Sequence, residues 1–486
     1  MNEAIRELRP RAIWNKFADL NAVPRPSKKE ERIIQFMLDF GKSLGLETFS
    51  DTVGNVIVRK PATKGMEKRQ LVTLQSHLDM VHQKNADTDF DFDTQGIQME
   101  ATKDWVKAKG TTLGADNGLG VATIMALLES TDIPHPPLEA LFTIDEETGM
   151  TGAMGLEANV LQGRILLNLD TEEDDEIDIG CAGGIDINAK REYKEKLAPR
   201  GVSSFEVTVK GLSGGHSGMD IHKGLGNANK IMNRLLYNGS GKYNIRISEI
   251  DGGGLRNAIP RESFAKIVVD KAHIASFEAD FKLWATTIKE ELIAKEPALS
   301  INLTPIGKLK KVMGLGAQEK FLMTVYAAQN GVYSMSATMA DLVETSNNIA
   351  RVGVKEGKIN IGCLTRSSVN SAKIDLSNSL KSVFELAGFE VTFEGMYPGW
   401  KPDPDSAILK VLEKQYEALF REKPKVVACH AGLECGILGQ NYPEMDMISF
   451  GPTIKGAHSP DERVSISSVQ KFWMFVQEIL KHIPEK

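Results

Sequence analysis

The sequence is poor in cysteine. Its four cysteines, at positions 181, 363, 429 and 435, are scattered among 486 residues, and no two of them form a CxxC pair. This spacing argues against a disulfide scaffold and against a cysteine-rich structural zinc site. Isolated thiols are typical of proteins in a reducing compartment, so we expect a cytoplasmic protein.

Strong net charge and long apolar runs are also lacking. The 58 Lys and Arg residues nearly balance the 65 Asp and Glu residues, which gives a net charge of −7. Because no basic cluster is interleaved with aromatic residues, the sequence does not predict a nucleic-acid partner. No stretch approaches about 18 consecutive apolar residues, and the first residues contain no apolar segment of signal-peptide length. We therefore expect neither a membrane span nor export.

The chain is longer than a single hydrophobic core supports, so we expect at least two domains. Residues 1–187 and 398–486 alternate apolar strands with helices, which predicts an α/β domain with a mixed sheet flanked by helices. Residues 188–397 instead show a roughly doubled βαββαβ order, which is typical of α+β, ferredoxin-like modules. The sequence thus predicts a discontinuous α/β domain interrupted by an inserted α+β domain.

The stretch from Leu71 to Val81 is a short apolar run that ends in two polar residues, His77 and Asp79. The run has the pattern of a buried strand. Residues i and i+2 of a strand point to the same face, so the imidazole and the carboxylate could be a metal ligand and the group that orients it. The alternative is a strand-end histidine beside a solvated aspartate.

A glycine-rich segment precedes the helix that we predict in the second half of residues 111–129, and it contains Asp116. One interpretation is a helix N-cap. A phosphate-binding loop is a second one, but the glycine spacing fits neither the dinucleotide fingerprint nor the P-loop, and an aspartate would repel phosphate. A metal ligand is the third interpretation.

Further polar residues follow other predicted strands. The strand over residues 138–144 leads into Glu146 and Glu147, the next strand ends at Asp170, and His458 lies in a glycine-rich loop after a later strand. Each placement alone fits a solvated turn. Because ligands gather at the carboxyl ends of strands in α/β sheets, the repetition favours a mixed His/carboxylate metal cluster, with ligand types that bind zinc.

Five ordered motifs resemble those of the di-zinc metallopeptidases, the family of aminoacylases, carnosinases, peptidase T and glutamate carboxypeptidases. They are His77-x-Asp79, Gly114-Ala-Asp116, Asp145-Glu-Glu-Thr-Gly149, Asn168-Leu-Asp170 and Gly456-Ala-His-Ser-Pro460. The resemblance covers essentially the whole chain and implies that the inserted domain is a lid and dimerisation domain. The forms Asp116-Asn-Gly-Leu-Gly120 and His430-Ala-Gly-Leu-Glu-Cys-Gly436 are most similar to the family's bacterial cytosolic dipeptidases.

The resemblance implies two Zn²⁺ per subunit, with Co²⁺ or Mn²⁺ able to substitute. It implies that His77 and Asp170 are terminal ligands of one ion, that Glu147 and His458 are terminal ligands of the other, and that Asp116 bridges them. Many relatives have a pair containing Lys where this chain has Asn117 and Gly118. That departure leaves the bridge intact but weakens any inference about tripeptide substrates.

The resemblance also assigns catalytic and substrate-binding roles. Glu146 would be the general base and Asp79 would orient His77, although the residues alone do not separate Glu146 from Glu147. Four positions of the inserted domain and the C-terminal part would meet the substrate, namely His216, Asn257, Arg366 and Gly432.

The implied activity is hydrolysis of small unblocked dipeptides, such as Xaa-His, by a homodimeric cytosolic enzyme. The alternatives are an N-acyl amino acid deacylase or a tripeptidase with the same metals, and an inactive binding protein on the same scaffold.

Overall fold

The computed structural model describes residues 2–486, which divide into two compact units. Of the described residues, unit 1 comprises 2–180, 400–428 and 433–486, and unit 2 comprises 181–399 and 429–432. The α/β class predicted from the sequence is confirmed. The bounds differ in two details. Unit 2 runs from 181 to 399, where the sequence predicted 188–397, and the short segment 429–432, which the sequence assigned to the first domain, belongs with unit 2 because Cys429 and Ala431 both accept a hydrogen bond from the Ala182 amide.

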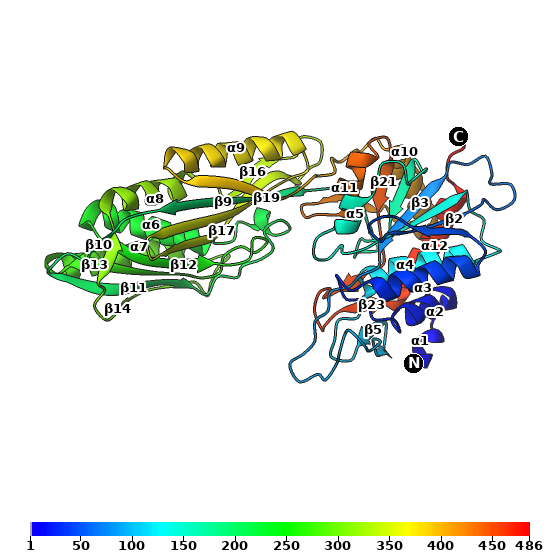
Figure 1. Ribbon diagram of the computed structural model, residues 1–486, viewed down its shortest axis with the longest axis horizontal. Coiled ribbons are helices and arrows are strands. Elements are labelled where there is room, and N and C mark those ends of the chain that lie inside the picture. Colours follow the sequence, from blue (N-terminus) through cyan, green and yellow to red (C-terminus); the bar gives the residue numbers. More distant parts are fainter. Residues whose placement is uncertain (1) are drawn as a thin grey trace. The chain divides into compact units, whose positions relative to one another are not determined.

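Unit 1 is built around an eight-stranded mixed sheet with the order β1-β2-β6-β3-β7-β21-β8-β20 (Figure 1). Its strands are β1 (Glu47–Ser50), β2 (Val56–Lys60), β3 (Val72–His77), β6 (Leu138–Thr143), β7 (Ile165–Asn168), β8 (Glu176–Cys181), β20 (Lys425–Cys429) and β21 (Asp446–Ser449). Strands β6, β3, β7 and β21 are parallel neighbours, so their carboxyl ends lie at one edge of the sheet. Every residue of β3, β6 and β7 is buried, as expected for strands covered on both faces.

The remaining elements of unit 1 cover or extend this sheet. Its helices are α1 (Glu3–Arg6), α2 (Arg11–Leu20), α3 (Glu31–Ser43), α4 (Ala115–Glu129), α5 (Thr151–Gly155), α10 (Ala407–Phe420), α11 (Glu434–Asn441) and α12 (Ile466–Lys481). Helix α4 is buried along nearly its whole length, which explains why it is apolar on all sides. A small antiparallel sheet joins β4 (Met99–Thr102), β5 (Trp105–Ala108), β22 (Ile454–Lys455) and β23 (Arg463–Ser465).

Unit 2 contains one nine-stranded sheet that has two ferredoxin-like modules. The first module is β11 (Val202–Lys210), α6 (Ala228–Tyr243), β12 (Arg246–Gly253), β13 (Ser263–Asp270), α7 (Ile274–Leu292) and β14 (Ser300–Pro305). The second is β9 (Gly183–Glu192), α8 (Leu315–Ala327), β17 (Val343–Lys355), β18 (Lys358–Ser367), α9 (Asn370–Leu386) and β19 (Glu390–Tyr397). The sheet order β14-β11-β13-β12-β17-β18-β9-β19 places the modules as mirror-ordered repeats joined by β12 and β17.

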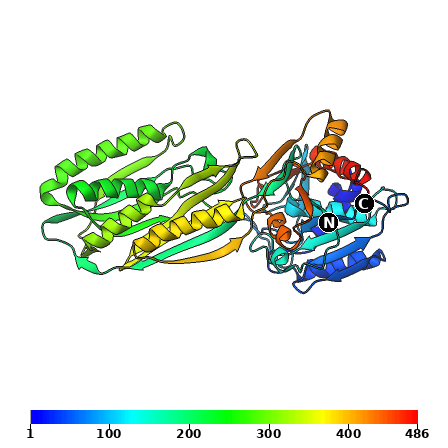
Figure 2. The ribbon, with the colours of Figure 1, turned by 90° about the horizontal axis from the view of Figure 1, so that it is seen from above.

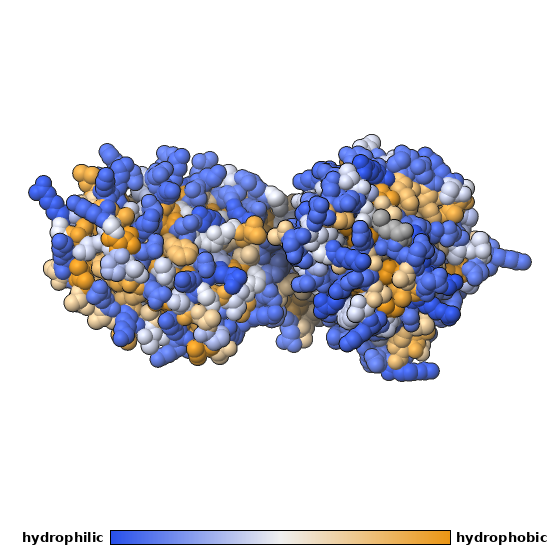
Figure 3. Space-filling view, turned by 90° about the horizontal axis from the view of Figure 1, so that it is seen from below, coloured by the Kyte–Doolittle hydropathy of each residue, from blue (hydrophilic) through white to orange (hydrophobic). Residues whose placement is uncertain are grey.

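Strand β9, which the sequence analysis did not predict, begins the second module, and the whole first module is inserted between it and α8. Strand β16 (Gly331–Met335) pairs with β17, and β10 (Glu195–Leu197) pairs with β15 (Lys311–Met313) outside the main sheet. The helices of unit 2 lie together over one face of the sheet (Figure 2). Seen from the opposite side, hydrophilic and hydrophobic residues are interspersed over this unit, in keeping with the alternating burial along β11 and β13 (Figure 3). Within residues 2–486, no helix is both long and apolar enough to cross a bilayer.

Candidate metal centre and a second polar site

His77 is the last residue of β3 and is 1% exposed. Its Nε2 lies 3.1 Å from Asp116 Oδ1 and 3.5 Å from Asp170 Oδ1. Asp170 follows the neighbouring strand β7, and Asp116 lies in the first turn of α4. The structure therefore brings together the ends of the neighbouring strands β3 and β7 and the glycine-rich start of α4, which are three places predicted from the sequence to carry metal ligands.

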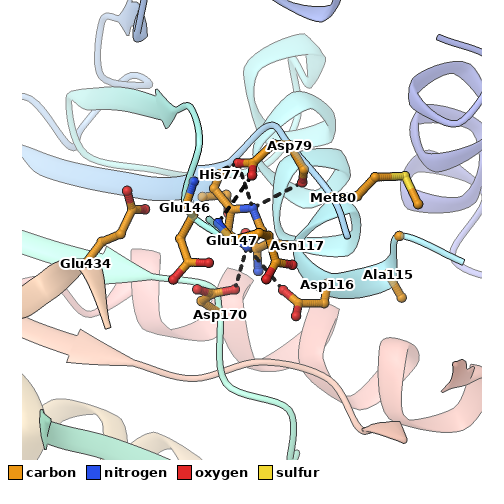
Figure 4. A network of polar contacts seen from close by, with 12 residues as sticks. His77, Asp79, Met80, Ala115, Asp116, Asn117, Glu146, Glu147, Asp170 and Glu434 are labelled. Carbon is orange, nitrogen blue, oxygen red and sulfur yellow. Dashed lines mark hydrogen bonds and ion pairs between the residues drawn. The ribbon is translucent and has the colours of Figure 1, made fainter. Parts of the chain in front are cut away.

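Asp79 lies on the other side of the His77 ring, with Oδ1 3.4 Å from Nδ1. Its carboxylate is fully buried and accepts hydrogen bonds from the Ser27 hydroxyl at 2.7 Å and from the backbone amides of Glu146 at 3.0 Å and Glu147 at 3.3 Å. Asp79 thus holds the His77 ring and the loop after β6 at the same time (Figure 4).

A second group of potential ligands shares Asp116. His458 Nε2 lies 3.1 Å from Asp116 Oδ2 and 3.1 Å from Glu147 Oε2. The triads His77–Asp116–Asp170 and Asp116–Glu147–His458 each bring their ligand atoms within 4.8 Å of one another, and His77 also forms such a group with Glu146 and Glu147. Two adjacent triads with one common carboxylate have the form of a dinuclear site.

The charges in this cluster fit bound cations. Hydrogen bonds to Asp116 and Glu147 raise the pKa of His458 to about 11. Burial raises the pKa of Asp170 to about 6, with the nearby Asp116 and Glu147 carboxylates adding to the effect. Glu147 Oε1 is buried and has no hydrogen-bond partner. A metal cation would satisfy this orphaned oxygen and would displace the protons that the imidazoles hold among the carboxylates.

The loop that carries Asp116 is fixed by two buried groups that the sequence analysis missed. The Glu462 carboxylate accepts hydrogen bonds from the amides of Leu113 and Ala115, each at 2.7 Å, and also from those of Gly114 and Asp116. The Arg25 guanidinium donates to the carbonyls of Leu78, Asp79 and Gly114. Nothing in the local sequence marked either residue, because Glu462 belongs to a polar loop and Arg25 to a proline-flanked turn.

Unit 2 contains a different polar site around His216 and Arg366. His216 Nδ1 accepts hydrogen bonds from the amides of Gly218 at 3.2 Å and Met219 at 3.0 Å, so the ring proton belongs on Nε2. Arg366 Nη2 lies 3.5 Å from that Nε2, and Arg366 Nη1 donates to the Tyr397 hydroxyl at 2.7 Å. Burial and the Arg366 charge lower the pKa of His216 to about 4, which keeps the ring neutral and able to donate from Nε2.

The other two substrate-binding positions expected from the sequence are less closely tied to this pair. The Asn257 side chain is exposed, while its carbonyl accepts a hydrogen bond from the Ser217 amide at 2.7 Å. Gly432 lies in the segment 429–432 of unit 2. In the same segment His430 is buried, and its Nε2 lies 2.8 Å from the Ser346 hydroxyl.

Comparison with known proteins gives a consistent assignment. The sequence profile of "Peptidase family M20/M25/M40" matches residues 73–482. The chain is 43% identical over 482 residues to the "Cytosol non-specific dipeptidase" of Escherichia coli (strain K12), covering 99% of both chains. An aminoacylhistidine dipeptidase from Vibrio alginolyticus superposes with a TM-score of 0.93 at 44% identity, covering 100% of this chain and 99% of the other. An aminopeptidase from Bacillus cereus shares the fold, with a TM-score of 0.58 at 16% identity, covering 98% of this chain and 99% of that one.

Proposed function

The chain belongs to peptidase family M20/M25/M40, and on that premise we propose that it is a cytosolic metallo-dipeptidase that hydrolyses small unblocked dipeptides, including Xaa-His. The names of the E. coli and Vibrio relatives support the substrate class and the location. The observation that carries the proposal is the pair of ligand triads sharing Asp116, with Glu146 beside them.

We propose that two metal ions, Zn²⁺ in the native enzyme, are held by these triads. His77 and Asp170 would bind one ion, Glu147 and His458 would bind the other, and Asp116 would bridge both. When bound, such ions polarise a scissile carbonyl and make water more acidic. Three ligand carboxylates against two divalent cations leave the site with a net positive charge, which favours the negative charge that develops during amide hydrolysis.

Residues of the chain would carry out the proton transfers and hold the substrate. Glu146 would take a proton from the attacking water and deliver it to the leaving amine. His216, neutral and protonated on Nε2, would donate a hydrogen bond to the developing oxyanion. Arg366 would bind the terminal carboxylate of the dipeptide, because its planar group suits two parallel hydrogen bonds. Asn257 and Gly432 would add contacts to the substrate.

A substrate panel with and without chelator tests this function. We expect Xaa-His and other free dipeptides to be cleaved, activity to disappear on chelation, and added Zn²⁺, Co²⁺ or Mn²⁺ to restore it. Preferential cleavage of N-acyl amino acids or tripeptides would favour the related hydrolases instead. Absence of any chelator-sensitive hydrolysis would favour a binding protein. Sedimentation analysis tests the homodimer that we propose from the family resemblance.

A further inference from the structure

A row of buried polar side chains crosses the sheet of unit 1, just before the strand ends that carry the proposed metal ligands. Its members are Thr143 on β6, Gln75 on β3, Asn168 on β7 and Ser449 on β21, four neighbouring parallel strands. All four side chains are 0% exposed. The strand register sets Gln75 opposite Asn168, and Asn168 opposite Ser449. Buried polar groups are costly unless they are paired, so a continuous row across four strands calls for an explanation.

One carboxylate at the end of this row fixes the orientation of both amides. Glu434 Oε2 accepts hydrogen bonds from Gln75 Nε2 and from Thr143 Oγ1, each at 2.6 Å. Because the Gln75 amino group faces Glu434, Gln75 Oε1 faces Asn168 and accepts from its Nδ2 at 2.5 Å. Asn168 Oδ1 then accepts from the Ser449 hydroxyl at 2.5 Å. A flip of either amide would set two donors or two acceptors against each other.

We propose that the hydrogen bond between Gln75 and Asn168 sets the separation of His77 and Asp170, and so controls the affinity for one of the two proposed metal ions. His77 lies two residues after Gln75, and Asp170 lies two residues after Asn168. The hydrogen bond between the Gln75 and Asn168 side chains therefore links β3 and β7 directly before the two ligands. His77 Nε2 and Asp170 Oδ1 are 3.5 Å apart above this tie. Gln75 and Asn168 are thus positioning residues. Figure 4 shows Glu434, the carboxylate that orients Gln75, beside the ligand cluster. The inference rests on the proposed metal-binding function.

The row lies two residues before the terminal ligands of only one triad, His77 and Asp170. The terminal groups of the other triad, Glu147 and His458, lie in the loops after β6 and after β22, and β22 belongs to the small antiparallel sheet. His458 Nε2 contacts Asp116 and Glu147, and neither is a member of the row. Loosening the row should therefore weaken the ion held by His77 and Asp170 selectively, whereas a general loss of stability would affect both ions.

Titration of the metal-free full-length protein with Co²⁺, followed by its visible absorption, tests this selectivity. Ser449→Ala removes the hydroxyl that holds Asn168, which also lies 2.9 Å from the Thr171 hydroxyl, and it removes no proposed ligand. We expect Co²⁺ affinity in one of two binding steps to fall about 10-fold, as for other groups that orient metal ligands, and the other step to change less than about 2-fold. Ser449→Thr should restore the affinity. The control is Thr123→Val, which removes a buried hydroxyl of α4 that has no hydrogen-bond partner.

A variant of a proposed ligand, Asp170→Asn, shows which ion the weakened step belongs to. It should weaken the same Co²⁺ binding step as Ser449→Ala. Asn168→Leu removes the tie itself and should exceed the effect of Ser449→Ala. Unchanged affinities in both row variants, or equal weakening of both steps, would overturn the role of the row. Binding of two Co²⁺ by the wild-type protein in that case would leave the proposed function standing. A wild-type protein that binds no Co²⁺ would instead overturn the proposed function, and the inference with it.

Discussion

The two polar sites use the same residue type in opposite electrostatic settings. In unit 1, His458 lies between the carboxylates of Asp116 and Glu147, which raise its pKa to about 11. In unit 2, burial and the Arg366 charge lower the pKa of His216 to about 4 and that of His430 to about 3. The neighbours of an imidazole, more than its sequence context, decide whether it holds a second proton or acts as a neutral hydrogen-bonding group.

The difference indicates opposite ligands for the two sites. Carboxylates crowded around His77 and His458 need positive charge, which metal ions supply. Arg366 with a neutral His216 beside it offers positive charge and hydrogen-bond donors, which suit a carboxylate or a developing oxyanion. A dipeptide carries both a carbonyl to be polarised and a terminal carboxylate, so a dipeptidase has use for both sites.

The sharpest test of the unit 1 site is Glu146→Gln, since it removes the proposed base and none of the proposed ligands. We expect kcat to fall at least about 1,000-fold, within the range for loss of general base catalysis, while two metal ions per chain are retained. Turnover and metal content by atomic emission measure the two effects separately. Glu157→Gln, an exposed carboxylate of the same unit, is the control. Near-normal turnover by the metal-loaded variant would exclude Glu146 as the base.

The matching test of the unit 2 site is Arg366→Ala. We expect kcat/KM for free dipeptides to fall about 100-fold, because the substrate carboxylate loses a charged, bidentate partner. C-amidated dipeptides should change little, and Arg366→Lys should give an intermediate loss since lysine keeps the charge but not the planar fork. Steady-state kinetics on paired free and amidated substrates measure the difference. Equal losses on both substrates would contradict a carboxylate-binding role.

Much of the metal cluster could be predicted because its residues follow strands with clear apolar patterns. His77 and Asp170 end such strands, and the parallel arrangement that α/β texture predicts brings those ends together. Roles within the adjacent pair Glu146 and Glu147 could not be separated, because that depends on how the loop after β6 is held by Asp79. The sequence gives the residues of that loop, but it does not show where the Glu146 and Glu147 side chains point.

Residues that act through contacts distant in sequence could not be predicted from the sequence. Glu434 and Glu462 are fully or nearly fully buried, yet in the sequence they look like ordinary acidic residues of a helix start and a loop. The doubled module was predicted from its element order, but the pairing of β12 with β17 and the place of β9 were not. These pairings join segments about a hundred residues or more apart, and local periodicity carries no information about them.

The histidine comparison also predicts how stability depends on pH. The pKa of His430 is lowered to about 3, below its unfolded value near 6.5, so its contribution to stability is present above that value and is lost as pH falls from about 6.5 to about 3. His430→Gln keeps a hydrogen-bonding group for Ser346 without the titration. Relative to this variant, we expect the wild-type protein to lose stability by up to about 1.4 kcal/mol per pH unit in that window, measured from urea unfolding. Parallel pH curves for the two proteins would show that His430 is not the responsible group.

The smallest expected effect is the opposite slope from a buried carboxyl of unit 1. Burial raises the pKa of Asp178 to about 7, from 3.8 in the unfolded chain, and Thr171 is its hydrogen-bond partner at 2.8 Å. Its stabilising contribution is therefore complete below about pH 4 and is lost as pH rises to about 7, a slightly narrower window than for His430. Asp178→Asn preserves the shape, and its amide oxygen can accept the hydrogen bond from the Thr171 hydroxyl at every pH. As pH rises from 4 to 7, we expect the free energy of unfolding of the variant to increase relative to that of the wild-type protein by about 1 kcal/mol per pH unit, in the same urea measurements. A difference that shrinks with rising pH would mean that Asp178 is ionised in the folded protein, and the contrast between the two units would then rest on the histidines alone.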